Sequence, residues 1–241
     1  MSTFVLIHGG CHGAWCWYKV VPLLEQHGHT VIAPDLPGHG RDKTPVSEVT
    51  LPAYVERVCH ILDAQPEPVV LIGHSMGGGI ITQTAEYRPA KIKTLVYLTA
   101  LLPANGESMG QVLRRNTAAV LPANIVPAAE PGATMIREGV LAEAFYGDCS
   151  AEDIALAKLL LVPQATAPLR TRLQTSAANF GRIPRVFIEC LRDQAHSLSF
   201  QRSVYETFPG QRVIAMDTSH SPFFSAPGEL AAHLAALPQT Y

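Results

Sequence analysis

The sequence is poor in the features that mark several large classes of protein. It has five cysteines among 241 residues, an odd number, and no two of them form a C-x-x-C pair. This pattern argues against a disulfide framework and against a zinc site. Charged residues make up only 16% of the chain, the formal net charge is -2, and Lys and Arg form no long run. Such a chain offers no positive face to phosphates, so we expect no nucleic-acid partner.

Long apolar runs are also missing. No stretch approaches the roughly 18 apolar residues that a membrane-spanning helix needs. The first ten residues, MSTFVLIHGG, lack the basic segment of a secretory signal and are typical of a buried strand. We therefore expect a cytoplasmic protein that does not associate with membranes.

Hydrophobic residues are abundant, at 47%, and they occur in short runs. Continuous apolar runs indicate strands that are buried on both faces of a parallel sheet. These runs cover residues 4–8, 30–35, 68–73, 94–100, 185–190 and 212–217. Helix-length segments lie between most of them, at 15–27, 51–64, 76–88, 198–208 and 227–237. The alternation predicts an α/β fold with a mostly parallel, doubly wound sheet of about six strands.

The alternation is interrupted between residues 103 and 183, a segment that we call the insertion. It shows no convincing strand, and clusters of proline and glycine divide it into short pieces. In the stretch CSAEDIALAKLLL, the spacing of Ser150 and Asp153 is a weak signal for the start of a helix. We expect the insertion to form a mostly helical cap over a core made of residues 1–102 and 184–241. Because ligands bind beyond the carboxyl ends of parallel strands, this cap would cover the site.

The stretch GHSMG places Ser75 between Gly73 and Gly77, where a predicted strand meets a predicted helix. This G-x-S-x-G spacing is typical of a sharp turn that exposes a nucleophilic serine. A serine needs a base to accept its proton. His220 follows the last apolar run and is the base that we predict, with His196 as the second candidate. His8, His12 and His74 are expected to shape the backbone or to line the site.

A catalytic histidine needs a carboxylate to fix its tautomer. Asp193 is the best candidate because it follows the fifth apolar run, and the order serine, aspartate, histidine is the one expected of this arrangement. Asp217 and Asp35 are the competing acids. The surroundings of Asp35, APDLPGHGRD, fit a side chain that stabilises a loop better.

A serine, histidine and aspartate in this arrangement are typical of acyl transfer, in which the serine attacks a carbonyl carbon. The carbonyl oxygen then becomes an oxyanion, and N–H groups are needed to stabilise it. We predict the N–H of Met76 and, from the loop HGGCHGAW, that of Gly10, with Cys11 as the alternative. Neither glycine-rich loop contains G-x-G-x-x-G or a P-loop lysine, and no His-x-x-x-His pair or acidic cluster lies on one predicted face. We therefore expect no nucleotide, metal or other cofactor.

The predicted substrate is a small to medium apolar carboxylic ester, hydrolysed through an acyl-enzyme. Apolar side chains of the first loop, the insertion and the last loop are the candidate pocket walls: Cys11, Trp15, Phe145, Tyr146, Leu160 and Phe223.

Four stretches together resemble one family, namely HGGCHGAWCWYK, VVLIGHSMGG, CSAEDIALAKLLLVPQ and SHSPFFSAPGEL. They are similar to the α/β-hydrolase superfamily, in the branch that holds plant methylesterases, hydroxynitrile lyases and bacterial carboxylesterases that include pyrethroid hydrolases. The resemblance runs from Phe4 to about Leu237. It implies a catalytic triad of Ser75, Asp193 and His220 under a helical cap.

The same resemblance separates the possible activities. The lyases of this branch carry a threonine after the first-loop histidine and a lysine after the catalytic histidine, whereas this sequence has Gly9 and Ser221. This difference favours an esterase over a hydroxynitrile lyase. A non-catalytic small-molecule receptor is the main alternative, because the fold also serves in hormone binding. The relatives also suggest a monomer or a homodimer formed through the cap.

Overall fold

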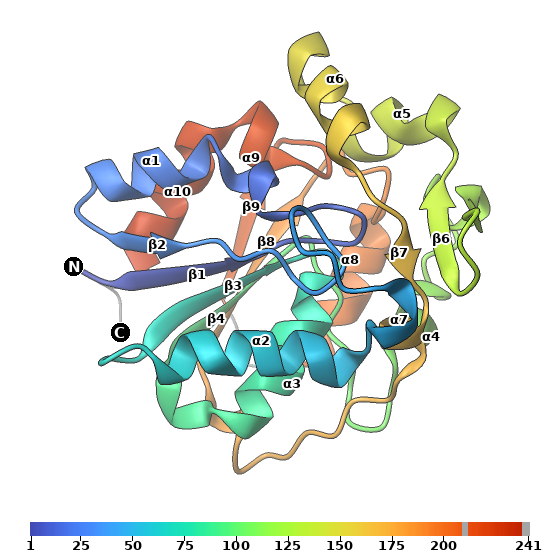
Figure 1. The fold of residues 1–241 in the computed structure, drawn as a ribbon. Coiled ribbons are helices and arrows are strands. Elements are labelled where there is room, and N and C mark those ends of the chain that lie inside the picture. Colours follow the sequence, from blue (N-terminus) through green and yellow to red (C-terminus); the bar gives the residue numbers. More distant parts are fainter. Residues whose placement is uncertain (209–211, 238–241) are drawn as a thin grey trace.

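A six-stranded parallel sheet forms the centre of the protein (Figure 1). The structure is a computed structural model that describes residues 1–208 and 212–237. The sheet order is β2-β1-β3-β4-β8-β9. The strands are β1 (Thr3–Ile7), β2 (Thr30–Ile32), β3 (Val69–His74), β4 (Ile92–Leu98), β8 (Arg185–Cys190) and β9 (Arg212–Met216). Each of the six predicted strands is confirmed.

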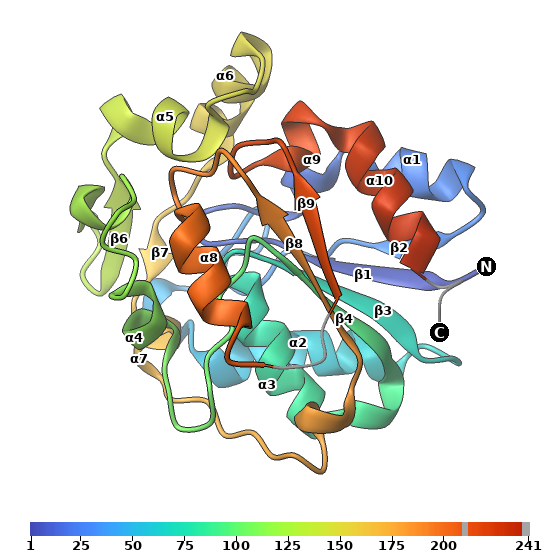
Figure 2. The same ribbon diagram turned by 180° about the vertical axis from the view of Figure 1, so that it is seen from behind.

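Helices cover both faces of this sheet (Figures 1 and 2). One face carries α1 (Val20–Gln26), α9 (Pro222–Ser225) and α10 (Pro227–Ala236), and the other carries α2 (Leu51–Asp63), α3 (Gly77–Tyr87) and α8 (Leu198–Tyr205). The predicted doubly wound α/β fold is therefore confirmed. None of the helices in the described residues has the length and apolarity that crossing a bilayer requires.

Strand β1 shows why its apolar run does not alternate. Phe4 and Leu6 belong to the hydrophobic cluster that α1 and α10 complete. Val5 and Ile7 point the other way, into the cluster that includes α2 and α3. All four side chains are fully buried, and each burial contributes about 1.5–3 kcal/mol. Both faces of the strand thus need apolar residues.

The order of the strands places two loops side by side at one edge of the sheet. β1 lies between β2 and β3, and the chain leaves β1 toward α1 on one face and β3 toward α3 on the opposite face. A crevice forms where neighbouring strands send their connections to opposite faces. The loop after β1 carries Gly10, and the turn after β3 carries Ser75.

The insertion lies beyond the carboxyl ends of the strands (Figure 1). It contains α4 (Met109–Leu113), β5 (Ile125–Pro127), β6 (Ala133–Ile136), α5 (Leu141–Tyr146), α6 (Ala151–Leu160), β7 (Gln164–Ala165) and α7 (Ala167–Arg170). The expectation that it would lack strands was wrong, because β5, β6 and β7 form a small antiparallel sheet. These strands are two to four residues long, too short to show a period of two.

The start of α6 follows its sequence signal. The hydroxyl of Ser150 accepts a hydrogen bond from the backbone N–H of Asp153 at 3.1 Å.

The division into a core of residues 1–102 and 184–241 and an inserted cap of residues 103–183 stays a prediction.

Candidate active site

Ser75 occupies a strained turn between β3 and α3. Its φ is 52°, in the left-handed region that side chains other than glycine rarely adopt. The flanking glycines are required sterically: a Cβ on Gly73 would lie 2.6 Å from the backbone of Gly77, and one on Gly77 would lie 2.8 Å from the carbonyl oxygen of Ile7. The G-x-S-x-G spacing therefore reflects close packing of β1, β3 and α3.

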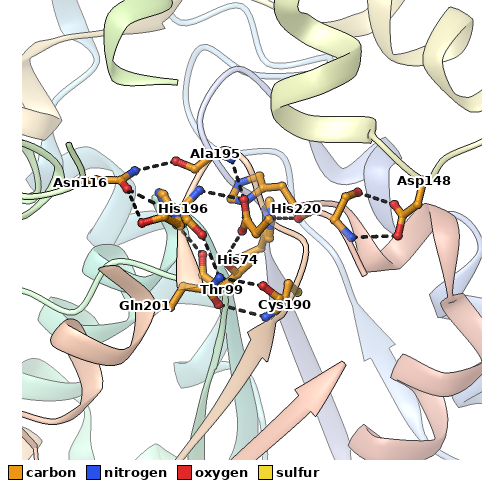
Figure 3. A network of polar contacts seen from close by, with 12 residues as sticks. His74, Thr99, Asn116, Asp148, Cys190, Ala195, His196, Gln201 and His220 are labelled. Atoms are coloured by element: carbon orange, nitrogen blue, oxygen red, sulfur yellow. Dashed lines mark hydrogen bonds and ion pairs between the residues drawn. The ribbon is translucent and has the colours of Figure 1, made fainter. Parts of the chain in front are cut away.

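His220 and Asp193 form a buried pair. The Nδ1 atom of His220 lies 2.7 Å from Oδ2 of Asp193, and both side chains are almost fully buried. The same oxygen accepts a hydrogen bond from the Thr99 hydroxyl at 2.5 Å. Its partner Oδ1 accepts the backbone N–H groups of Ala195 and His196, each at 2.7 Å. Figure 3 shows this network.

These contacts determine the charge of Asp193. Burial by itself would raise the pKa of this carboxyl group, but the charge interaction with His220 and the hydrogen bonds from His220 and Thr99 bring the pKa below its ordinary value. The group is therefore an ionised carboxylate at neutral pH. Because a carboxylate only accepts hydrogen bonds, Nδ1 of His220 must carry a proton and donate it to Asp193. With the Nδ1 proton held in this way, Nε2 is the ring nitrogen that can accept a proton.

Ser75 and His220 line the same cavity, of about 70 Å³. Within the described residues, no hydrogen bond joins the Ser75 hydroxyl to His220. Such contacts are often loose before substrate binds and tighten in the complex. Among the described residues that line the cavity, none is a lysine, arginine, aspartate or glutamate. The site therefore suits an uncharged ligand.

The other candidate base, His196, has a different role. Its Nδ1 bonds to the carbonyl oxygen of Thr99 at 2.8 Å, and only its backbone N–H contacts Asp193. Burial lowers the pKa of His196 to about 4, so its ring is neutral at pH 7. His74 similarly donates from Nε2 to the carbonyl oxygen of His220 at 2.9 Å, and burial lowers its pKa. Both histidines thus surround His220 without adding charge.

The competing acids lie away from His220. Asp217 has a side chain that is 77% exposed, and it pairs with Arg192 at 3.0 Å. Asp35 accepts hydrogen bonds from the N–H groups of Ala14 at 2.7 Å and Arg41 at 3.1 Å. Asp35 thus holds two loops together, as its sequence context suggests.

Histidines orient the peptide groups of the loop after β1. Nδ1 of His8 donates to the carbonyl oxygen of Gly9 at 2.8 Å, and Nδ1 of His12 donates to that of Gly10 at 2.7 Å. The C=O and N–H of a trans peptide point in opposite directions. The N–H of Gly10 therefore points away from His8, and that of Cys11 points away from His12.

Only one of these two N–H groups has an acceptor in the described residues. The N–H of Cys11 donates to Oε1 of Gln164 at 3.3 Å. The N–H groups of Gly10 and Met76 have no acceptor there, and both residues line the cavity. The two candidate oxyanion donors that we favour from the sequence are thus the ones left unoccupied.

The structure corrects part of the expected pocket wall. Of the six predicted side chains, Cys11 and Phe145 line the cavity, whereas Trp15, Tyr146, Leu160 and Phe223 do not. Trp15 stacks on His12 with ring centroids 5.3 Å apart, and the Tyr146 hydroxyl bonds to Nε2 of His12 at 2.8 Å. Phe223 packs edge-on against His74 at 5.0 Å. These three rings thus contact His12 or His74 rather than the cavity. Leu160 lies on α6 and is 37% exposed.

Most of the apolar wall comes from residues that the sequence did not single out: Leu101, Leu113, Leu121, Ile125, Ile136 and Leu169. Five of these six lie in the insertion, where short elements leave no periodic pattern to read. Gln164 and Thr99 were missed as well. The sequence around a single buried polar residue gives no signal of the group to which it will bond.

One group of side chains has the spacing of a metal site. Within the described residues, ligand atoms of Asp193, His196 and His220 lie within 4.8 Å of one another. These residues already bond to each other and to Thr99. The cluster is accounted for by hydrogen bonding.

Comparison with known proteins shows which family this chain belongs to. Residues 4–233 match the alpha/beta hydrolase family. The chain is 33% identical to Methylesterase 9 of Arabidopsis thaliana over 100% of both chains. Its structure is similar to polyneuridine aldehyde esterase (28% identity, 99% of both chains, TM-score 0.89). It is also similar to a pyrethroid hydrolase from Sphingobium faniae JZ-2 (33% identity, 100% of this chain and 99% of the other, TM-score 0.88).

The chain therefore belongs to the alpha/beta hydrolase family, which confirms the resemblance found in the sequence. It is a carboxylic ester hydrolase.

Proposed function

We propose that this protein is a serine carboxylesterase that hydrolyses small to medium apolar esters through an acyl-enzyme, without a cofactor. One observation carries the proposal. Asp193 holds His220 at 2.7 Å, and His220 shares the wall of an apolar cavity with the strained Ser75.

In the proposed first step, the Ser75 oxygen attacks the carbonyl carbon of the ester. Nε2 of His220 accepts the proton of the hydroxyl, and Asp193 stabilises the imidazolium that forms. The C–O bond to the alcohol then breaks, and His220 returns the proton to the leaving oxygen. Water repeats the sequence on the acyl group and regenerates Ser75.

The carbonyl oxygen becomes negatively charged during both steps. The N–H groups of Gly10 and Met76 are the proposed donors, and each such donor typically contributes 10²- to 10³-fold in rate. Met76 immediately precedes α3, so the helix N-terminus adds its positive end. The Cys11 N–H is a weaker candidate because Gln164 already occupies it.

The cavity supports an apolar substrate. Among the described residues that line it, none is a lysine, arginine, aspartate or glutamate that could pair with a charged substrate, and an unpaired buried charge costs several kcal/mol. Ser221, which stands where the related lyases carry a lysine, is fully buried. Its hydroxyl supplies no cation for a cyanide leaving group, and this favours ester hydrolysis.

Two 4-nitrophenyl esters of similar size test this substrate class. We expect kcat/KM for 4-nitrophenyl hemisuccinate to be at least about 100-fold lower than for 4-nitrophenyl butyrate, because its carboxylate would be buried without a partner. Nitrophenolate absorbance measures both rates. Equal rates would contradict the apolar pocket. Failure to hydrolyse any ester of a panel with varied acyl and alcohol groups would favour a receptor.

A further inference from the structure

The insertion contacts the loop after β1 through Gln164. This side chain is 4% exposed. Its Oε1 accepts the Cys11 N–H at 3.3 Å, and its Nε2 donates to the hydroxyl of Tyr54 at 3.2 Å. The contacted residue is strained, because φ of Cys11 is 63°, and such a conformation persists only where its surroundings hold it. Gln164 therefore holds the backbone one residue beyond Gly10, together with the Val162 N–H, which donates to the Cys11 carbonyl oxygen at 2.9 Å.

The loop that carries His220 is held in the same way by Asp148, which lies between α5 and α6. Its carboxylate accepts the backbone N–H of Ser219 at 2.8 Å and also the Ser219 hydroxyl. Ser219 directly precedes His220 in the chain. Arg192 lies 3.4 Å from the carboxylate and balances part of its charge. Figure 3 shows Asp148 on the opposite side of His220 from His196.

The loop that carries Asp193 is held by Asn116, which follows α4. Nδ2 of Asn116 donates to the carbonyl oxygen of Ala195 at 2.6 Å, and Oδ1 accepts the N–H of Ser197 at 3.3 Å. The side chain is 1% exposed, and Figure 3 shows it reaching the loop from the side opposite Asp148. Asn116 thus holds the turn on both sides of His196, and the N–H groups of Ala195 and His196 in this turn donate to Asp193.

We propose that Asn116, Asp148 and Gln164 are positioning residues, through which the insertion aligns the acid, the base and the oxyanion donor. We call them the three anchors. Each is a polar side chain of the insertion that binds the backbone of a different loop at the carboxyl edge of the sheet. Active-site groups must be held to within about 0.5 Å, and loops need supporting contacts to achieve this. The inference rests on the proposed function, because it assigns these loops their catalytic groups.

Gln164→Met tests the first anchor, because it removes the amide with little change of volume. Gln83→Met is the matched control: Gln83 is also 4% exposed and bonds to the backbone of Gln174, but it does not line the cavity. We expect similar losses of melting temperature in both variants. Only Gln164→Met should lose about 10- to 100-fold in kcat for 4-nitrophenyl butyrate, with little change in KM. Its affinity for a trifluoromethyl ketone, whose adduct carries an oxyanion, should fall by the same factor.

Asp148→Ala and Asp148→Asn test the second anchor. Alanine removes the acceptor for the Ser219 N–H and should lower kcat by about 10- to 100-fold. Asparagine keeps an acceptor oxygen and should restore most of kcat.

Asn116→Ala tests the third anchor. It should lower kcat to a similar extent as Asp148→Ala, with little change in KM.

Two results would overturn the inference: equal kcat losses in Gln164→Met and Gln83→Met, or wild-type kcat in Asp148→Ala. If one of the three anchor variants does not fold, the other two decide. Ser75→Ala is measured in parallel to separate this inference from the proposed function. If Ser75→Ala is as active as wild type, the proposed function fails. If Ser75→Ala is inactive and the anchor variants keep wild-type kcat, only the anchors fail.

Discussion

Ser75→Ala should lower kcat for 4-nitrophenyl butyrate by about 10⁶-fold and leave KM nearly unchanged. The substitution removes the atom that forms the acyl-enzyme, while the cavity wall loses only one oxygen. What remains is the contribution of the oxyanion donors and of substrate binding. Steady-state hydrolysis with purified variant measures the effect. A variant that keeps more than about one hundredth of wild-type kcat would exclude Ser75 as the nucleophile.

Ser225→Ala is the matched control for this prediction. The Ser225 hydroxyl is buried and, within the described residues, has no hydrogen-bond partner. It also lies outside the cavity lining. We expect wild-type kcat in this variant, which shows that removal of a buried hydroxyl is not itself harmful.

Asp193→Asn should lower kcat by about 10⁴-fold. An amide that turned its NH₂ toward His220 would donate to Nδ1 and force the proton onto Nε2, the atom that must accept the proton of Ser75. The opposite orientation would place the NH₂ against the N–H groups of Ala195 and His196, which now donate to Oδ1. Either orientation disrupts the hydrogen bonds that orient His220, so the loss should appear in kcat at every pH where the wild type is active.

Asp217→Asn is the control for the acid, since its side chain is 77% exposed and should not affect kcat. Wild-type activity in Asp193→Asn, with a loss in Asp217→Asn, would reassign the acid.

The free energy of unfolding should also depend less on pH in Asp193→Asn than in the wild type. The folded-state pKa of Asp193 is lowered, so the stability that its carboxylate contributes is present above its unfolded pKa. That contribution is lost as the pH falls through the lowered pKa. Urea unfolding against pH measures this difference.

The core of the fold and the residues of the proposed triad could be predicted from the sequence because both follow from one geometric rule. The carboxyl ends of parallel strands meet at a common edge, so loops after β3, β8 and β9 converge however far apart they lie in the chain. Continuous apolar runs revealed the strands, and Ser75, Asp193 and His220 each follow one of them. Asp193 could be preferred over Asp217 by its position after β8.

The insertion could not be predicted to the same depth. Its strands β5, β6 and β7 are too short for a period to appear, and β7 pairs with β6 across a long stretch of chain. The three anchors are single polar residues whose partners lie on other loops. The aromatic rings of Trp15, Tyr146 and Phe223 were placed in the right region, but the sequence does not tell whether a ring faces the cavity or packs behind a histidine.

The most direct test of the account is stoichiometric phosphorylation by diethyl 4-nitrophenyl phosphate. An activated serine attacks phosphorus, its oxygen forms the new P–O bond, and 4-nitrophenolate leaves. Cys11 is the nearby thiol to distinguish, and burial raises its pKa to about 12, which makes it a poor nucleophile. We predict one diethylphosphoryl group per chain, mapped to Ser75 by peptide mass spectrometry, with activity lost in parallel. Labelling of any other residue as activity disappears, or full labelling of Ser75 with activity intact, would contradict the account.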